Sequence, residues 1–208
     1  MKTISFKIIA CALALYLSSC AKRNFFPDPD DPGLSLLTSH GFNIATAYIN
    51  NVPYINPFDP GTLGIGGVNS APGLELIKTG NTFDTLCLSW QFEINDNTSN
   101  NNQHYPTIST ISLLMPVPKS FTKTDFFALN GQRFSSNTNA VVLRSYHNYF
   151  DTLSGTSNIY FVSIKYDNTS GSITNLAFSG LFDANIGDSI LITKGRFDFE
   201  IDAATLNF

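Results

Sequence analysis

The segment 82–94 constrains the fold most strongly, because apolar and polar residues alternate along nearly its whole length. A period of two places one set of side chains on each face of an extended strand, so a half-buried β-strand is predicted here. Trp90 belongs to the apolar set. Beside leucine and phenylalanine it is expected to anchor a core, and the alternative is an exposed platform on which a sugar ring stacks. The apolar set is Leu86, Leu88, Trp90, Phe92 and Ile94.

Similar short segments recur along the chain and are separated by turn signals such as Asn50-Asn51. Such a succession is typical of sandwiches and barrels. Residues 120–129 hold the single plausible helical turn, with Thr124-Asp125 as its expected cap. We therefore predict an all-β fold, an antiparallel β-sandwich of about eight to ten strands, in one domain that spans residues 34–208. The further strands are expected at 44–49, 52–55, 107–115, 140–146, 159–166, 173–182 and 188–201.

Composition supports this fold and excludes some partners. Only 13% of the residues are charged and 13% are aromatic, a mixture that favours strands and turns over helices. The formal net charge is −4, and no cluster of basic residues follows Lys22-Arg23. Nucleic acid is therefore not an expected partner, because its phosphates reward grouped Lys and Arg side chains.

The first twenty residues carry a targeting signal. Lys2 and Lys7 precede an apolar run at 8–17, which is shorter than the ~20 residues that a membrane span needs. The sequence Leu17-Ser18-Ser19-Cys20 follows, and it resembles the lipobox of bacterial lipoproteins. That resemblance implies that residues 1–19 are a signal peptide and that Cys20 is acylated and holds the protein on a membrane. The alternative is an ordinary secretory signal in which a cysteine falls at the cleavage site.

Residues 20–33 are expected to form a stiff, disordered tether behind the lipid. Three prolines alternate with three aspartates between Pro27 and Pro32, and such a composition cannot bury enough apolar surface to order itself. The aspartates could suggest calcium. An EF-hand loop, however, also needs a glycine at its sharp turn and a closing bidentate glutamate, and neither is in register here.

A second resemblance lies near the two ends of the expected domain. The segment 190–199 contains Gly195-Arg196-Phe197-Asp198, and the segment 45–50 reads Ala-Thr-Ala-Tyr-Ile-Asn. Both resemble strands of small β-rich lipoproteins of unknown function in Bacteroidota. The resemblance implies a β-rich fold on the cell outer membrane and brings no activity with it. Surface-exported lipoproteins of those bacteria carry acidic residues behind the lipidated cysteine, whereas this chain has Lys22-Arg23, so the face of the membrane stays open.

No catalytic constellation emerges from the sequence. The three histidines, His40, His104 and His147, lack the spacing of a zinc site, and no Gly-x-Ser-x-Gly elbow is present. Cys87 lies inside an apolar strand, where a packed, inert thiol is expected. We therefore predict that the protein is not an enzyme and needs no metal or cofactor.

Two functional classes remain: a structural or assembly component of the cell envelope, and, as the alternative, a module that binds glycans or envelope proteins. Rings at exposed tips would favour binding. The candidates are Tyr105, Tyr146, Tyr149 and Phe150. The alternative is that these rings cover the open ends of the sandwich.

Three short segments resemble the Asp-Ser/Thr-aliphatic acceptor of O-glycosylation in Bacteroidota envelope proteins. Thr152 is the preferred acceptor, because it is expected between a loop that begins at His147 and a turn at Ser154-Gly155, where a bulky group disturbs no packing. The three candidate acceptors are Thr152, Thr85 and Ser189.

Overall fold

The computed structural model describes residues 26–57, 72–79, 82–94, 107–146, 149–167, 175–187 and 190–206. In this part of the chain the protein is all-β, with nine antiparallel strands, one short helix and one 3-10 turn, as the sequence predicts. The strands are β1 (Ile44–Ile49), β2 (Val52–Pro57), β3 (Gly73–Ile77), β4 (Phe83–Ile94), β5 (Thr107–Pro118), β6 (Arg133–Tyr146), β7 (Tyr149–Asp167), β8 (Asn175–Ile186) and β9 (Ile190–Asp202); the helix is α2 (Lys123–Ala128) and the turn is η1 (Ala203–Thr205).

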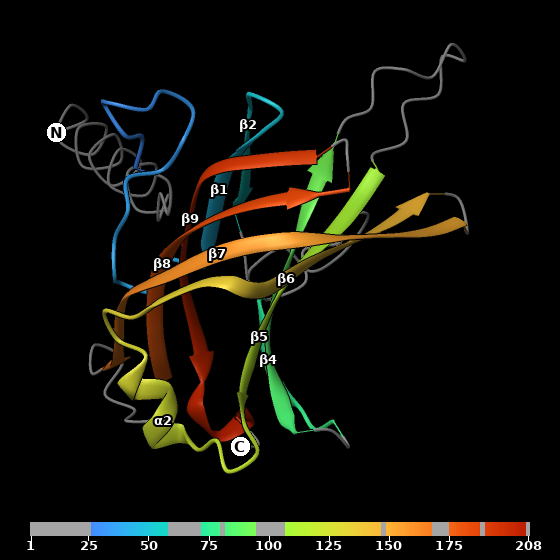
Figure 1. The fold of residues 1–208 in the computed structure, drawn as a ribbon. Coiled ribbons are helices and arrows are strands. Elements are labelled where there is room, and N and C mark those ends of the chain that lie inside the picture. Colours follow the sequence, from blue (N-terminus) through green and yellow to red (C-terminus); the bar gives the residue numbers. More distant parts are fainter. Residues whose placement is uncertain are drawn as a thin grey trace, which may run out of the picture.

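The strands follow the order β2-β1-β9-β8-β7-β6-β5-β4-β3 (Figure 1). Each neighbour is consecutive in sequence except one, because the last strand, β9, pairs with the first, β1. The ladder folds over itself so that β4 faces β8 and β9, which gives the two layers of a sandwich. Pro53 lies in β2, at one end of the ladder, where a residue that cannot donate a ladder hydrogen bond is tolerated.

Aromatic side chains fill the space between the layers. The Trp90 ring lies 5.0 Å from the Phe182 ring and 5.7 Å from the Phe199 ring, and only 1% of Trp90 is exposed. Trp90 therefore anchors the core, and it is not an exposed platform on which a sugar ring could stack. Phe197 joins the same cluster, stacked on Phe199 at 5.7 Å.

The helix α2 closes one end of the core. Its cap is Thr122, and the expected cap at Thr124 is wrong. The Thr122 hydroxyl accepts from the backbone N–H of Asp125, and the Asp125 carboxylate accepts from the backbone N–H of Thr122. This reciprocal pair satisfies two otherwise free donors and starts the helix two residues earlier. Phe126 is then directed into the core, where its ring lies 5.8 Å from that of Phe178.

The predicted turn at Ser154-Gly155 is wrong, because both residues lie inside β7. Gly155 pairs with Ile186 of β8, and a Cβ atom at this position would lie 1.9 Å from the backbone oxygen of Asn185. The glycine therefore permits a close approach of two strands and does not mark a chain reversal.

Candidate functional site

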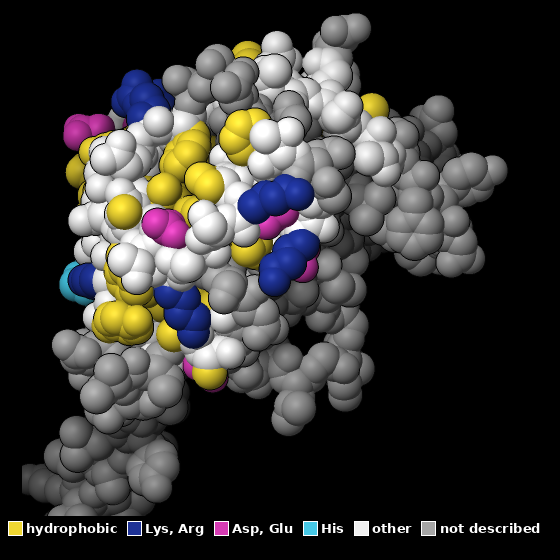
Figure 2. Space-filling model, turned by 60° about the horizontal axis from the view of Figure 1, so that its bottom comes forward, with side chains coloured by type: hydrophobic (Ala, Val, Ile, Leu, Met, Phe, Trp, Pro, Cys, Tyr) yellow, Lys and Arg dark blue, Asp and Glu magenta, His cyan; other side chains and the backbone are white. Residues whose placement is uncertain are grey.

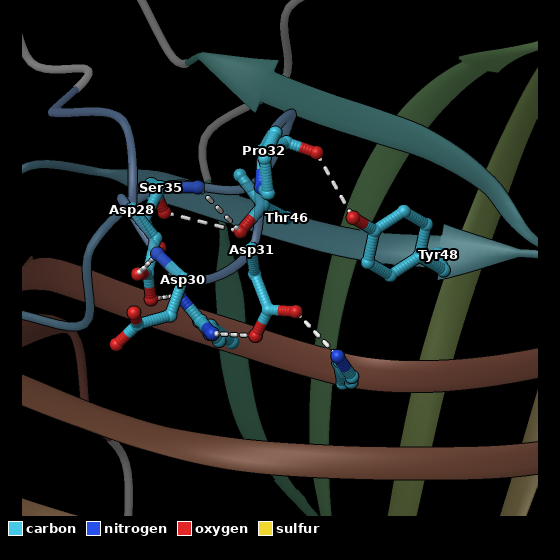
Figure 3. Close-up of polar contacts among 9 residues, drawn as sticks. Asp28, Asp30, Asp31, Pro32, Ser35, Thr46 and Tyr48 are labelled. Carbon is cyan, nitrogen blue, oxygen red and sulfur yellow. Dashed lines mark hydrogen bonds and ion pairs between the residues drawn. The ribbon is translucent and has the colours of Figure 1, made fainter.

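The most elaborate polar arrangement in the described part of the chain joins its N-terminal segment to the outer face of β1 and β9 (Figure 3). We call residues 26–43 the N-terminal strap. The sequence predicts a disordered tether up to residue 33, and from residue 26 onward that prediction is wrong. An isolated β-bridge joins Pro27 to Ser35 within the strap, and the side chain of Leu34, which also belongs to the strap, is fully buried.

The residues of β9 alternate between the core and the strap. Gly195 and Phe197 face inward, and a Cβ at Gly195 would meet the Phe182 ring at 2.5 Å. Lys194, Arg196 and Asp198 point outward, and each of them contacts the strap. One strand therefore closes the core with one set of side chains and fixes the N-terminal segment with the other.

Arg196 is the centre of the arrangement. Its guanidinium forms ion pairs with the carboxylates of Asp28 and, at 2.8 Å, Asp31. It also donates to the backbone oxygen of Ser35 at 2.7 Å. The arginine side chain is only 12% exposed. A planar guanidinium that binds two carboxylates and a carbonyl in a partly dry setting imposes a defined geometry on the strap.

Lys194 and Asp198 extend these contacts on either side. The Lys194 ammonium pairs with Asp31 and lies 5.9 Å from the centre of the Tyr48 ring. Asp198 is buried, and its carboxylate accepts from the hydroxyl of Thr38 and, at 2.8 Å, from the backbone N–H of Gly41. The strap is thus held at successive outward positions of β9.

Residues of β1 make a second set of contacts with the strap. The Thr46 hydroxyl lies 3.1 Å from that of Ser35 and accepts from the backbone N–H of Ser35 at 3.3 Å. Tyr48 donates its hydroxyl proton to the backbone oxygen of Pro32 at 2.9 Å. The polar residues of the two segments used for the second resemblance, 45–50 and 190–199, therefore meet at one place, against the strap. The contact of these two segments with the strap was not predicted from the sequence.

The ion pairs change the titration of their members. The backbone N–H of Asp30 and then the Arg196 guanidinium lower the pKa of Asp28 below its ordinary value of 3.8. The bond to Asp31 raises the pKa of Lys194. Two of the three aspartates considered for calcium are thus engaged by cationic side chains. Within the described ranges no group of three or more His, Cys, Asp or Glu side chains is placed to hold a metal ion.

Acid is expected to loosen the strap. Because the pKa of folded Asp28 is depressed, its ionised form stabilises the native state above pH 3.8, and this contribution disappears as the pH falls through the lower, folded-state value. Asp28→Asn should remove part of that dependence. We expect the urea unfolding free energy to fall less between pH 5 and pH 2.5 in Asp28→Asn than in the wild type. Equal losses in the two proteins would contradict the role of Asp28.

None of the four aromatic residues predicted for binding belongs to the strap. Tyr146 and Tyr149 pair directly at the end of the β6–β7 hairpin, and Phe150 follows in β7. Their side chains, and all of Tyr105, lie outside the described residues, as do Cys20 and Ser189. The structure therefore brings none of the aromatic candidates into a described site.

Two candidate glycosylation acceptors can be placed. Thr152 is exposed and lies in β7 opposite Leu143 of β6, where β8 has not yet joined the ladder. It lies in a strand and not between a loop and a turn. Thr85 is half-buried in β4 between two neighbouring strands. Thr152 thus has the more accessible hydroxyl of the two.

Cys87, the one cysteine in the described part of the chain, is buried in β4. Burial and the nearby carboxylate of Glu75, directly opposite on β3, raise the pKa of this thiol. A raised pKa keeps the sulfur protonated near neutral pH, whereas a nucleophile requires the thiolate. Cys87 thus behaves as a small apolar residue of the core.

The outer surface carries no broad region of one charge in the view of Figure 2: among the coloured side chains, basic, acidic and hydrophobic groups are interspersed. None of the helices in the described ranges has the length and apolar character to traverse a bilayer. Neither a protein-family model, nor a curated protein sequence, nor a solved structure matches this chain.

Proposed function

We propose that the protein is a lipid-anchored component of the cell envelope with a structural or assembly role, attached to the outer membrane through Cys20. The lipobox-like sequence at 17–20 supports the anchor. The observation that carries the proposal is the strap: Lys194, Arg196 and Asp198 are all used to fix the segment that leads from Cys20 into the fold.

This use of charge fits a protein that is held by its N-terminus. A chain anchored at residue 20 passes a pull from the membrane to the point where the strap is fixed to the sheet, which begins at Asp28, the partner of Arg196 of β9. Charge-assisted bonds to Asp28 and Asp31 place that fixed point on a central strand and not on an edge. The strap therefore meets the sheet in one defined geometry, as a building block of a larger assembly requires.

Removing the acyl site should release the protein. With Cys20→Ser, no lipid can be attached, and we expect the chain to move from the washed outer-membrane fraction to the soluble fraction, because several acyl chains hold a protein far more tightly than polar contacts do. The matched control is Cys87→Ser, which alters a thiol inside the fold and should leave the fractionation unchanged. A Cys20→Ser protein that stayed with the washed membranes would refute attachment through this residue.

A further inference from the structure

The strap carries a pair of exposed apolar side chains. Phe26 is 46% exposed and Leu36 is 47% exposed. The backbone N–H of Leu36 donates to the oxygen of Phe26, so the two residues are neighbours, and the ring of Phe42 lies 5.5 Å from that of Phe26. The two side chains together form a small apolar patch that a partner or a membrane can cover.

The covalent distance to the proposed lipid site is short. Five residues lie between Cys20 and Phe26, and the six extended steps that join the two residues span at most about 20 Å. Asp28, two residues further on, is fixed to β9 by Arg196. If Cys20 is acylated, Phe26 stays within this reach of the lipid headgroups. The strap is consequently the described segment that the anchor tethers most closely to the bilayer.

The charges around the pair permit such an approach. Arg196 and Lys194 neutralise Asp28 and Asp31, so these carboxylates bring no free negative charge to the lipid surface. Lys165 of β7 is exposed beside the strap, where its ammonium lies 3.5 Å from the Ser39 hydroxyl. Asp30 stays exposed at the turn of the strap and can remain in the hydrated headgroup layer.

We propose that the strap docks on the phospholipid leaflet that holds the acylated Cys20 and that Phe26 and Leu36 enter its interfacial layer. This inference rests on the proposed function, since the leaflet is reached only through the anchor. Docking buries two apolar side chains that water otherwise surrounds, and it sets the orientation of the sandwich relative to the membrane.

The test uses the full acylated chain in vesicles of phosphatidylethanolamine and phosphatidylglycerol. An environment-sensitive fluorophore is attached at Leu36→Cys or, as the control, at Phe83→Cys. Phe83 is 57% exposed at the start of β4, and Figure 1 shows that end of β4 and the blue strap on opposite sides of the molecule. The buried Cys87 does not compete for the label.

We expect iodide quenching at position 36 to fall by about threefold or more on reconstitution into vesicles, because the label leaves the water, while quenching at position 83 stays unchanged. Adding Phe26→Ser to the chain labelled at position 36 should restore much of the quenching. Adding Ile77→Ser, which alters an exposed side chain on β3, should not.

Three results would overturn the inference. If the chain is membrane-bound but both labels remain equally open to iodide, the docking is wrong and the anchor stands. If the wild-type chain does not stay with washed membranes, the anchor is wrong, and the docking that depends on it is wrong as well. Equal protection of both labels would also contradict it, since that would mean general burial of the domain and no specific orientation.

Discussion

Phe197→Ala is expected to lower the free energy of unfolding by about 4 kcal/mol, because truncation of a fully buried phenylalanine loses the burial of its ring and leaves a cavity. This is the largest loss that we expect from a single substitution. Phe197 is 1% exposed and lies at the centre of the aromatic cluster. Its ring is 5.8 Å from that of Phe161, 6.1 Å from that of Phe178 and 5.7 Å from that of Phe199. The Trp90 ring of β4 lies 6.4 Å from it in the facing layer, so truncation removes packing from both layers of the sandwich.

Urea unfolding followed by tryptophan fluorescence measures this loss directly, because Trp90 is the single tryptophan of the chain and belongs to the same cluster. Phe83→Ala is the matched control. Phe83 is largely exposed, and its truncation should change the unfolding free energy by less than about 1 kcal/mol. A Phe197→Ala protein that lost no more than this control would contradict the described core.

Arg196→Met is expected to cost about 2–3 kcal/mol, because it keeps the apolar stem of the side chain and removes the guanidinium. The carboxylates of Asp28 and Asp31 and the carbonyl of Ser35 would then lose their common donor while still partly shielded from water. The expected consequence is local as well as global: thermolysin should cleave within residues 26–37 of the variant under conditions that leave the wild-type strap intact.

Arg133→Met supplies the control for an arginine on the same outer face. Arg133 is exposed, and its guanidinium lies 5.6 Å from the centre of the Tyr160 ring. Such a contact at an exposed site contributes about 0.5–1 kcal/mol, so its loss should be small, and it should leave the strap resistant to the protease. Equal effects of the two substitutions would mean that Arg196 acts as a general surface charge and does not fix the strap.

The strands could be predicted because their signal is local. In 83–94, neighbouring residues alone decide which face is apolar, and the core position of Trp90 follows from the company of Leu88 and Phe92. The capping box of α2 was missed, although Thr122 and Asp125 have the required spacing. The strand position of Ser154-Gly155 was not readable, because the strand that requires the glycine, β8, lies some thirty residues further along the chain.

The strap could not be predicted from its own composition. Prolines and aspartates at 27–32 favour disorder when they are read locally. The groups that order them, Lys194 and Arg196, follow more than 160 residues later and reach the strap only because β9 pairs with β1. An available signal was the outward position of both cations on β9, on either side of the inward-facing Gly195, which implies polar partners on the outer face. Acylation of Cys20 and glycosylation of Thr152 stay predictions from sequence.

The central claim is that the fold begins at the strap, and amide hydrogen exchange of the strap tests it most directly. The backbone N–H groups of Asp28, Leu34 and Gly41 each donate to an acceptor in the described structure. We predict that they exchange at least about a hundredfold more slowly than an unstructured chain, and that Arg196→Met removes this protection at Asp28 and Leu34 before any strand opens. Exchange at the unprotected rate in the wild-type protein would show that residues 26–43 are a free tether and would contradict the account.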